Sequence, residues 1–564
     1  MITGSDLQIK ALSHFFIGDA MYNKEDIKNA RLELNTFIGM AKGLNNLPPQ
    51  SSIAAANYDL GYTYFDEGNY NEALKYFDQA MSGFKTYKAS DDTYVGSAII
   101  PDITLRIGDC YLKKNNYNKA KENYDIAITR NYPNLVYAMF QKAMISGLQG
   151  DRNTKINALR NIADRYQNSD YADDALLELG TTYDGMNRPL DGIATLNRLI
   201  KEHSKKSNLV NKALLKMGLM YYNTNDYNNA LATYKEVFKY NPTKDEANAA
   251  LTAIKEIYIN DLKRPDEYFA YAESLPGFKA STDEKESAAY QVAENYYQEG
   301  KYSEAITALT EYIKKYPKGA NSMEAIFFRG ECYTTLKKYT EGLADYKAII
   351  ALGNSEYYKD ALEKAAIISY NYNQNFTEAY QYYSTLAEVE TKEEKKFEAQ
   401  LGALRSAHRI GNNTEVIRIA DLVIKNTRAS VAQKASANFY RGKSSQELKD
   451  YNTALESYNE VIRNSENEQT AESRYRVAQI YYMRNDLTSA EELAQEAMEA
   501  NNDYPYWVAK SLILTADILT DKKDYLNAKA ALEAVIDNFH DDKDISAEAN
   551  AKLEAVKKKE NSGK

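Results

Sequence analysis

The side chains that could carry out acid–base or metal chemistry are scattered along the chain. None of its four histidines lies near a cysteine at the spacing of a metal site. The histidines are His14, His203, His408 and His540, and the cysteines are Cys110 and Cys332. No glycine-rich phosphate loop follows a predicted strand, and there is no Gly-x-Ser-x-Gly elbow. We therefore expect no cofactor, no metal centre and no enzymatic activity.

Charge and hydropathy narrow the classes of partner. The chain has 70 basic and 80 acidic residues, a net charge of −10, and its longest basic run is Lys557–Lys559. A nucleic-acid groove needs clustered Lys and Arg, so we expect no nucleic-acid partner, and the basic run fits a solvated helix end. No apolar stretch is long enough to span a membrane. Cys110 and Cys332 fit small buried residues better than a disulfide.

The sequence repeats itself. From Gly61, aromatic or small residues follow at offsets of 3, 9, 12, 16 and 19 residues, namely Tyr64, Tyr70, Ala73, Phe77 and Ala80. The same ladder starts at Gly108 and again at Gly218. Small residues at the first position (the anchor) and twelve residues later let two amphipathic helices approach closely, and the aromatic residues fill the gaps. One such pair cannot bury its apolar face alone, but a stack of pairs can.

Fourteen anchors can be placed, and from Ala143 onward each step is 36 to 38 residues. The anchors are Gly18, Gly61, Gly108, Ala143, Gly180, Gly218, Lys255, Ala293, Gly330, Ile367, Arg405, Gly442, Ala478 and Ala516.

This ladder resembles the tetratricopeptide repeat family, whose pattern is small–x2–Tyr–x5–Tyr–x2–Ala–x3–aromatic–x2–Ala, often ended by proline. Pro242 and Pro317 stand where that proline belongs. The resemblance covers nearly the whole chain. It implies an all-α, right-handed superhelical solenoid of about fourteen antiparallel helix pairs, and a role in holding other proteins or extended peptide segments.

A finer resemblance concerns the linkers. Residues 313–320 and 165–172 resemble the envelope subset of bacterial tetratricopeptide proteins, which includes the outer-membrane assembly lipoprotein and the Tol-Pal-associated coordinator. Residues 266–271 and 506–511 resemble very long bacterial proteins of this type, whose arrays continue toward the N-terminus. We expect a scaffold or adaptor of the bacterial envelope, associated with the outer membrane on its periplasmic side, with a signal or N-terminal region outside this sequence. A cytoplasmic location is the alternative.

Two anchors have the wrong chemistry. Lys255 and Arg405 stand where a small residue is needed, and a long charged side chain is not buried there without a partner. Either the packing opens locally or the assigned register is off by a residue or two. We interpret 243–286 as a degenerate repeat and candidate joint between an N-terminal arm, 1–242, and a C-terminal arm, 287–564. An ordinary degenerate repeat without a bend is the alternative.

In the resembled family the first helix of each pair lines the concave groove. The corresponding positions lie three before, one after and four after each anchor, which is one helical stripe. We single out as groove residues Tyr58, Tyr62, Phe65, Glu256, Tyr290, Glu294, Tyr297, Phe327 and Glu331. The three glutamates would stack at about 10 Å, the spacing of packed helices.

The sharper hypothesis is a groove for a basic or amide-rich extended segment, anchored by the aromatic residues. The alternative is that the glutamates are a solvated stripe and the aromatic residues pack between repeats. The family's carboxylate clamp for chaperone tails needs Lys three before the anchor and Asn one after it. Lys364 is followed by Ile368 at that second position, so a clamp of this kind is not expected.

Two rival functions remain. A glycan-binding envelope lipoprotein with embedded tetratricopeptide helices would need tryptophan-rich platforms, but the one tryptophan, Trp507, fits a cap between adjacent repeats better than an exposed contact. An α/α-toroid lyase or glycosidase would carry long catalytic loops and would not keep a 37-residue ladder. We favour the scaffold hypothesis over both.

Overall fold

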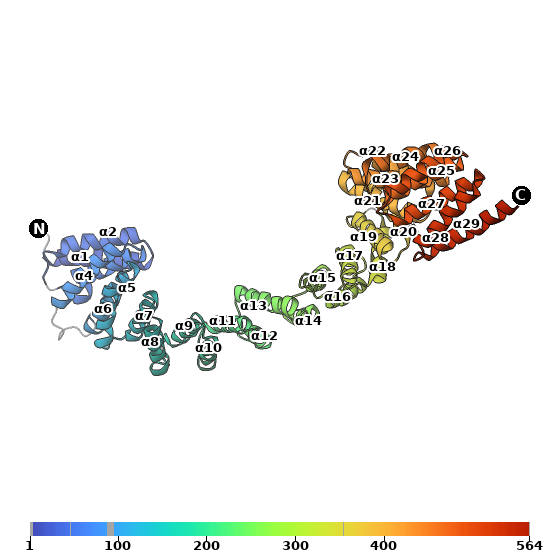
Figure 1. The fold of residues 1–564 in the computed structure, drawn as a ribbon. Coiled ribbons are helices and arrows are strands. Elements are labelled where there is room, and N and C mark those ends of the chain that lie inside the picture. Colours follow the sequence, from blue (N-terminus) through green and yellow to red (C-terminus); the bar gives the residue numbers. More distant parts are fainter. Residues whose placement is uncertain (1–3, 46, 87–94, 354, 563–564) are drawn as a thin grey trace. The chain divides into compact units, whose positions relative to one another are not determined.

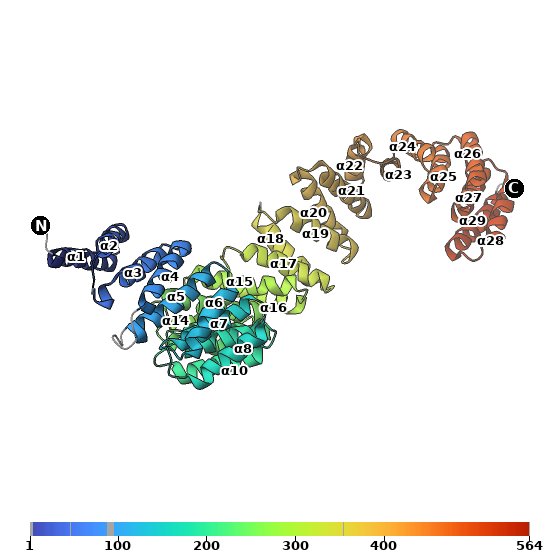
Figure 2. The same cartoon turned by 90° about the vertical axis from the view of Figure 1, so that its left-hand side faces the viewer.

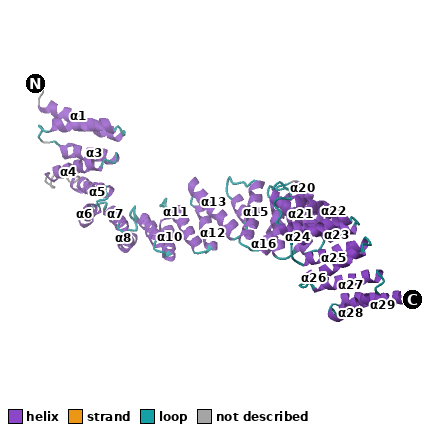
Figure 3. Ribbon diagram, turned by 45° about the horizontal axis from the view of Figure 1, so that its top comes forward, coloured by secondary structure: helices purple, strands orange, loops and turns teal. Residues whose placement is uncertain are grey.

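The computed structural model describes residues 4–45, 47–86, 95–353 and 355–562. Within these ranges every regular element is a helix and no strand occurs (Figure 3). The predicted all-α solenoid is confirmed, whereas the hand of its superhelix and its number of repeats stay predictions. In the same ranges, no helix is both long and apolar enough to cross a membrane.

Residue contacts divide the chain into two compact units, Met1–Gly277 (unit 1) and Phe278–Lys564 (unit 2). The boundary falls inside the segment 243–286. The predicted arms and the predicted joint remain predictions, because the positions of the two units relative to one another are not determined.

Unit 1 is a succession of helices joined by short turns (Figure 1). Its α-helices are α1 (Gly4–Asn23), α2 (Ile27–Ala41), α3 (Ile53–Asp66), α4 (Tyr70–Thr86), α5 (Ile100–Lys113), α6 (Tyr117–Thr129), α7 (Leu135–Leu148), α8 (Arg152–Arg165), α9 (Ala172–Asp184), α10 (Pro189–His203), α11 (Val210–Asn223), α12 (Tyr227–Glu236), α13 (Lys244–Glu256) and α14 (Pro265–Glu273). Four short 3-10 or π segments accompany them: η1 (Pro49–Ser51), η2 (Val95–Ile99), η3 (Val237–Lys239) and η4 (Ile257–Asp261).

Unit 2 continues the alternation of long helices and tight turns (Figure 2). Its helices are α15 (Thr282–Gln298), α16 (Tyr302–Lys315), α17 (Ser322–Thr335), α18 (Tyr339–Leu352), α19 (Tyr358–Asn371), α20 (Phe376–Val389), α21 (Glu393–Arg409), α22 (Asn413–Lys425), α23 (Val431–Glu447), α24 (Tyr451–Asn464), α25 (Glu468–Met483), α26 (Leu487–Ala500), α27 (Pro505–Asp521), α28 (Tyr525–Asn538) and α29 (Lys543–Ser562).

The two helices of each pair are joined by a turn that contains one residue in the left-handed conformation. Gly68 (φ 75°), Asn115 (φ 58°) and Gly300 (φ 73°) are examples, each seven residues after its anchor. The next residue often caps the second helix, as when Asn116 accepts a hydrogen bond from the backbone N–H of Lys119. This turn reverses the chain, so the second helix runs antiparallel to the first and packs against it.

Anchor glycines mark the point where the two helices of a pair cross. A Cβ atom on Gly61 would lie 2.5 Å from the ring of Phe77, and one on Gly218 would lie 2.6 Å from the ring of Tyr234. In both cases the ring belongs to the residue sixteen positions further on. The same relation holds at the other glycine anchors, Gly18, Gly108, Gly180, Gly330 and Gly442. The aromatic or leucine side chain thus fills the space that the glycine leaves open, as the ladder predicts.

The anchor assigned to Arg405 is wrong by one residue. Arg405 is exposed, whereas Leu404 is buried and lies seven residues before the left-handed Gly411. Leu404 therefore takes the crossing position. Burying the Arg405 guanidinium at the crossing would need an ion-pair partner, and none of the described residues forms an ion pair with it.

At Lys255 the packing opens instead. Ala250 and Ile254 are fully buried in the pattern expected for an anchor at 255, but Lys255 itself is exposed. The π segment η4 follows and places the left-handed Lys263 eight residues on instead of seven. The helices of this pair, α13 and α14, make the smallest contact of all the pairs.

The remaining single residues behave as expected. Cys110 and Cys332 are buried free thiols. Trp507 is 8% exposed and packs beside Tyr475, with the ring centroids 5.6 Å apart, so the prediction of a core cap is confirmed.

Substituting Gly218 tests the packing at the crossing. We expect Gly218→Ala to lower the free energy of unfolding by about 1–3 kcal/mol, because the added methyl group overpacks against Tyr234. Gly39→Ala in α2 is the matched control, since its Cβ would meet nothing within 4 Å; it should raise stability by about 0.5–1 kcal/mol through helix propensity. Urea unfolding followed by circular dichroism measures both. Equal effects of the two substitutions would contradict the crossing geometry.

Candidate interaction surface

In both units, odd-numbered helices come together on one side. Among the stronger helix contacts, alternate helices touch only where both are odd-numbered, as in α1 with α3, α15 with α17 and α25 with α27. On a curved stack the helices that approach one another most closely lie on the inner side. We call the surface of the odd-numbered helices at the positions three before, one after and four after each anchor the inner face.

The predicted residues Tyr58, Tyr62 and Phe65 lie together on α3. The Tyr58 and Tyr62 rings meet edge to face with centroids 5.1 Å apart, and all three side chains are half-buried. The Tyr58 hydroxyl donates a hydrogen bond of 2.9 Å to Asp102 of α5, and the Tyr62 hydroxyl donates to the same carboxylate oxygen. These tyrosines therefore tie neighbouring helices together and leave only ring surface for a partner.

Asp102 belongs to a buried charge network that our sequence analysis missed. The Arg106 guanidinium lies 3.5 Å from Asp102 and 2.5 Å from Asp109. Asp109 is only 4% exposed and also accepts hydrogen bonds from the hydroxyls of Tyr124 (2.6 Å) and Tyr137 (2.7 Å). Spacing alone could have found Asp109, which follows the anchor Gly108. Asp102 and Arg106 lie outside the groove stripe, so only the neighbouring helices reveal their role.

Arg106 is expected to stabilise unit 1 through this network. Arg106→Met leaves the buried Asp109 carboxylate without its cation, and we expect a loss of about 3–5 kcal/mol in the free energy of unfolding. Arg106→Met combined with Asp109→Asn should recover part of that loss.

The control is Arg463→Met, which removes an exposed ion pair with Glu460 and should cost less than about 0.5 kcal/mol. Urea unfolding measures all three variants. A loss for Arg106→Met as small as that of the control would refute the structural role of the network.

The middle of α3 also holds a carboxyl group whose pKa is shifted, Asp59. Burial, and then the nearby Asp19 carboxylate, raise the pKa of Asp59 to about 7 from its ordinary value of 3.8. Between these two pH values the folded chain binds a proton that the unfolded chain has released. The contribution of Asp59 to the free energy of unfolding is therefore greatest below about pH 4, and it is lost as the pH rises toward 7.

We expect Asp59→Asn to remove this pH dependence. At pH 8 the variant should be more stable than the wild type by at least about 1 kcal/mol, and at pH 4 the difference should vanish. Urea unfolding at a series of pH values measures the difference, and the exposed Asp170→Asn variant sets the baseline. A difference that does not change between pH 4 and pH 8 would count against the assigned titration.

In unit 2 the predicted aromatic residues are partly used in packing. Tyr290 is 7% exposed and packs against Tyr312, so it is not available to a partner. Tyr297 stacks on Phe328 with centroids 4.7 Å apart. Phe327 stacks on Tyr357, which directly precedes α19, with centroids 4.9 Å apart. Tyr297 and Phe327 keep half-buried faces on the inner side.

The three predicted glutamates differ in their surroundings. Glu256 is exposed on α13 in unit 1, whereas the other two lie in unit 2, so a continuous stripe of three stays a prediction. Glu294 accepts a hydrogen bond from Gln298 (3.1 Å). Glu331 accepts one from Tyr346 (2.7 Å) and forms an ion pair with Lys364 (2.9 Å). The charge of Glu331 is therefore compensated by Lys364, whereas Glu294 forms no ion pair with a described residue.

Beyond Glu331 the inner face of unit 2 becomes basic. Lys364, Arg405 and Lys443 follow on α19, α21 and α23. Lys443 is paired with Glu472 at 3.0 Å, whereas Arg405 forms no ion pair with any residue that the structure describes. The corrected register places Arg405 at the groove position immediately after the anchor Leu404.

A hollow of about 310 Å³ lies between α21 and α23 beside Arg405. It is lined by Leu401, Leu404, Arg405, Ala432, Gln433, Ser436, Ala437 and Tyr440. Apolar walls with a few convergent polar groups are typical of a ligand-binding site. Within the described ranges, no group of three or more His, Cys, Asp or Glu residues is placed to hold a metal ion.

Family profiles described as tetratricopeptide repeat match six segments of the chain. The matches cover 54–82, 102–133, 174–205, 212–243, 290–357 and 439–505. A comparison with curated proteins gives no match.

Solved structures similar to the chain include tetratricopeptide proteins. The C-terminal part of a tetratricopeptide repeat-containing protein from Cytophaga hutchinsonii is 13% identical, with a TM-score of 0.29, and the match covers 62% of this chain and 99% of that one. A tetratricopeptide repeat protein from Parabacteroides merdae is 12% identical, with a TM-score of 0.27, covering 56% and 98%. The Naa15/Naa10 complex bound to HypK-THB gives 14% identity and a TM-score of 0.29, covering 98% and 91%.

Proposed function

The chain belongs to the tetratricopeptide repeat family and is a protein-interaction scaffold, and from this premise we propose that it acts without catalysis within a bacterial envelope complex on the periplasmic side. Support for the envelope comes from the linkers 165–172 and 313–320, which resemble those of envelope tetratricopeptide proteins. The mechanism is multivalent contact along the odd-numbered helices, with no bond made or broken.

The observation that carries this proposal is the hollow beside Arg405 on the inner face of unit 2. An extended partner segment would place an acidic side chain against the unpaired guanidinium and an apolar side chain between α21 and α23. Further along the same face, a basic residue of the segment would meet Glu294, and aromatic ring faces of Tyr297 and Phe327 would flank it. We propose proteins, and not nucleic acids, as the partners, because this face carries acidic as well as basic side chains.

A glycan-binding role receives no comparable support. Stacking on a sugar ring needs an exposed aromatic side chain, and Trp507 is only 8% exposed. Its indole packs between Tyr475 and Tyr506.

The test is crosslinking of the tagged full chain in its own cell, followed by fractionation of the envelope and mass spectrometry. We expect one set of envelope proteins to be enriched, and Arg405→Glu and Glu294→Lys each to reduce that enrichment about tenfold, which corresponds to about 1.4 kcal/mol. Lys425→Glu, an exposed charge reversal on α22, is the control and should leave the enrichment unchanged.

Two results would count against the proposal. Partners that persist in both inner-face variants would show that binding lies elsewhere on the chain. Recovery of the protein and its partners in the cytoplasmic fraction would refute the envelope assignment while leaving the scaffold intact.

A further inference from the structure

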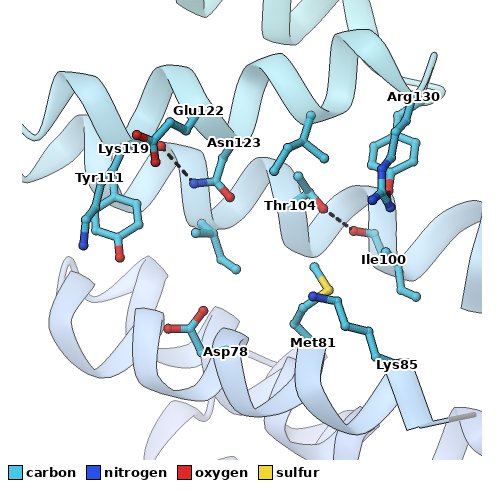
Figure 4. A pocket seen from close by; sticks show the side chains of 13 residues that line it. Asp78, Met81, Lys85, Ile100, Thr104, Tyr111, Lys119, Glu122, Asn123 and Arg130 are labelled. Atoms are coloured by element: carbon cyan, nitrogen blue, oxygen red, sulfur yellow. Dashed lines mark hydrogen bonds between the residues drawn. The ribbon is translucent and has the colours of Figure 1, made fainter.

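Unit 1 has a hollow that is separate from the inner face. It lies over α5, between α4 and α6, and has a volume of about 390 Å³ (Figure 4). Its floor is formed by Ile100, Thr104, Ile107 and Tyr111, which occupy a different side of α5 from the groove positions around Gly108. Binding here would therefore not compete with a segment on the inner face.

The middle of the hollow is apolar. Met81 of α4, Ile107 of α5 and Ile126 of α6 line it, and Ile126 keeps 41% of its surface exposed. Covering apolar surface with a ligand removes it from water and favours binding. An aliphatic side chain is the group that gains most from this position.

The two ends of the hollow carry different charges, as Figure 4 shows. Lys85, in the last turn of α4, and Arg130, at the end of α6, stand at one end. Asp78 and Glu122, with Lys119 between the helices, stand at the other. One end is thus purely basic, and the other is acidic on balance.

These five charges have no ion-pair partner within the chain that the structure describes. The neighbouring Lys142 and Lys155, by contrast, pair with Asp125 and Glu178. Partial burial raises the pKa of the Asp78 carboxyl, although Lys119 and Lys85 act in the opposite direction. All five side chains are exposed, so they are accessible to the opposite charges of a ligand.

The dimensions of the hollow select an extended segment. Lys119 and Arg130 are eleven residues apart on α6, about 16 Å along the helix, which equals the length of about five extended residues. Spread over that length, about 390 Å³ leaves room for one extended chain.

We propose that this hollow binds an extended segment of a partner protein about five residues long, with a basic residue at one end, aliphatic residues in the middle and an acidic residue at the other end. The acidic side chain lies between Lys85 and Arg130, and the basic side chain meets Asp78 and Glu122. The segment adds a second contact, on the outer side of unit 1, to those made on the inner faces.

Fluorescence polarisation with the full chain tests this proposal. The probe is a fluorescein-labelled, end-capped pentapeptide pool with Lys first, Asp last and mixed Leu, Ile and Val between. Two control pools carry Lys at both ends or Asp at both ends. We expect the Lys/Asp pool to bind at least about tenfold more tightly than either control, because each control places a like charge at one end of the hollow.

A charge reversal supplies the decisive comparison. In Lys85→Glu combined with Arg130→Glu, both ends of the hollow are acidic, so the pool with Lys at both ends should become the tightest binder. Lys205→Glu combined with Lys206→Glu changes the net charge of unit 1 equally at exposed positions and should keep the original order. Circular dichroism confirms that each variant is folded.

Three results with the peptide pools would overturn the proposal. They are the absence of saturable binding of the Lys/Asp pool, equal binding of the three pools, and an order of affinity that Lys85→Glu with Arg130→Glu does not change. Arg405→Glu, on the inner face of unit 2, must leave the affinity of the pool unaltered; loss of binding in that variant would place the pool on the inner face and refute the outer site.

Discussion

A small residue at the crossing of two helices is the constraint on which the rest of the structure depends. Where glycine stands at the anchor, a ring or leucine sixteen residues later fills the crossing, and the pair packs along its length. Close pairs bring the odd-numbered helices of each unit together and create the inner face. At Lys255 a charged residue stands at this position and the π segment η4 follows, and the contact between α13 and α14 is the smallest of all the pairs. The binding surfaces are thus a consequence of backbone approach, not of dedicated loops.

Much of this architecture can be predicted from residue spacing, because each anchor, aromatic residue and turn recurs with one period. The ladder also selected Tyr58, Tyr62 and Phe327 as groove residues; they lie half-buried on odd-numbered helices, and their role in binding stays a prediction. Residue spacing gave the wrong anchor at Arg405. Leu404 and Arg405 are adjacent in sequence, and only the burial of Leu404 shows that it occupies the helix crossing. The π segment after α13 has no spacing signal at all.

The candidate sites were harder to predict than the fold. Groove offsets located Glu331 but not its compensation by Lys364, which comes from the next pair. The buried network of Asp102, Arg106 and Asp109 combines groove and non-groove positions, so it appears only when the helices are assembled. The hollow over α5 depends on the separation of α4 and α6, which no local pattern encodes. Charges left unpaired in such places distinguish a contact surface from the many charges paired within the chain.

Photocrosslinking in cells tests the central claim, that the odd-numbered helices of unit 2 hold the partner. A photoreactive residue at Leu401, inside the hollow between α21 and α23, is compared with one at Leu422, which is 43% exposed on α22. The account predicts a partner adduct from position 401 and none from position 422. An adduct formed from position 422 alone would show that the even-numbered helices carry the interaction and would contradict the account.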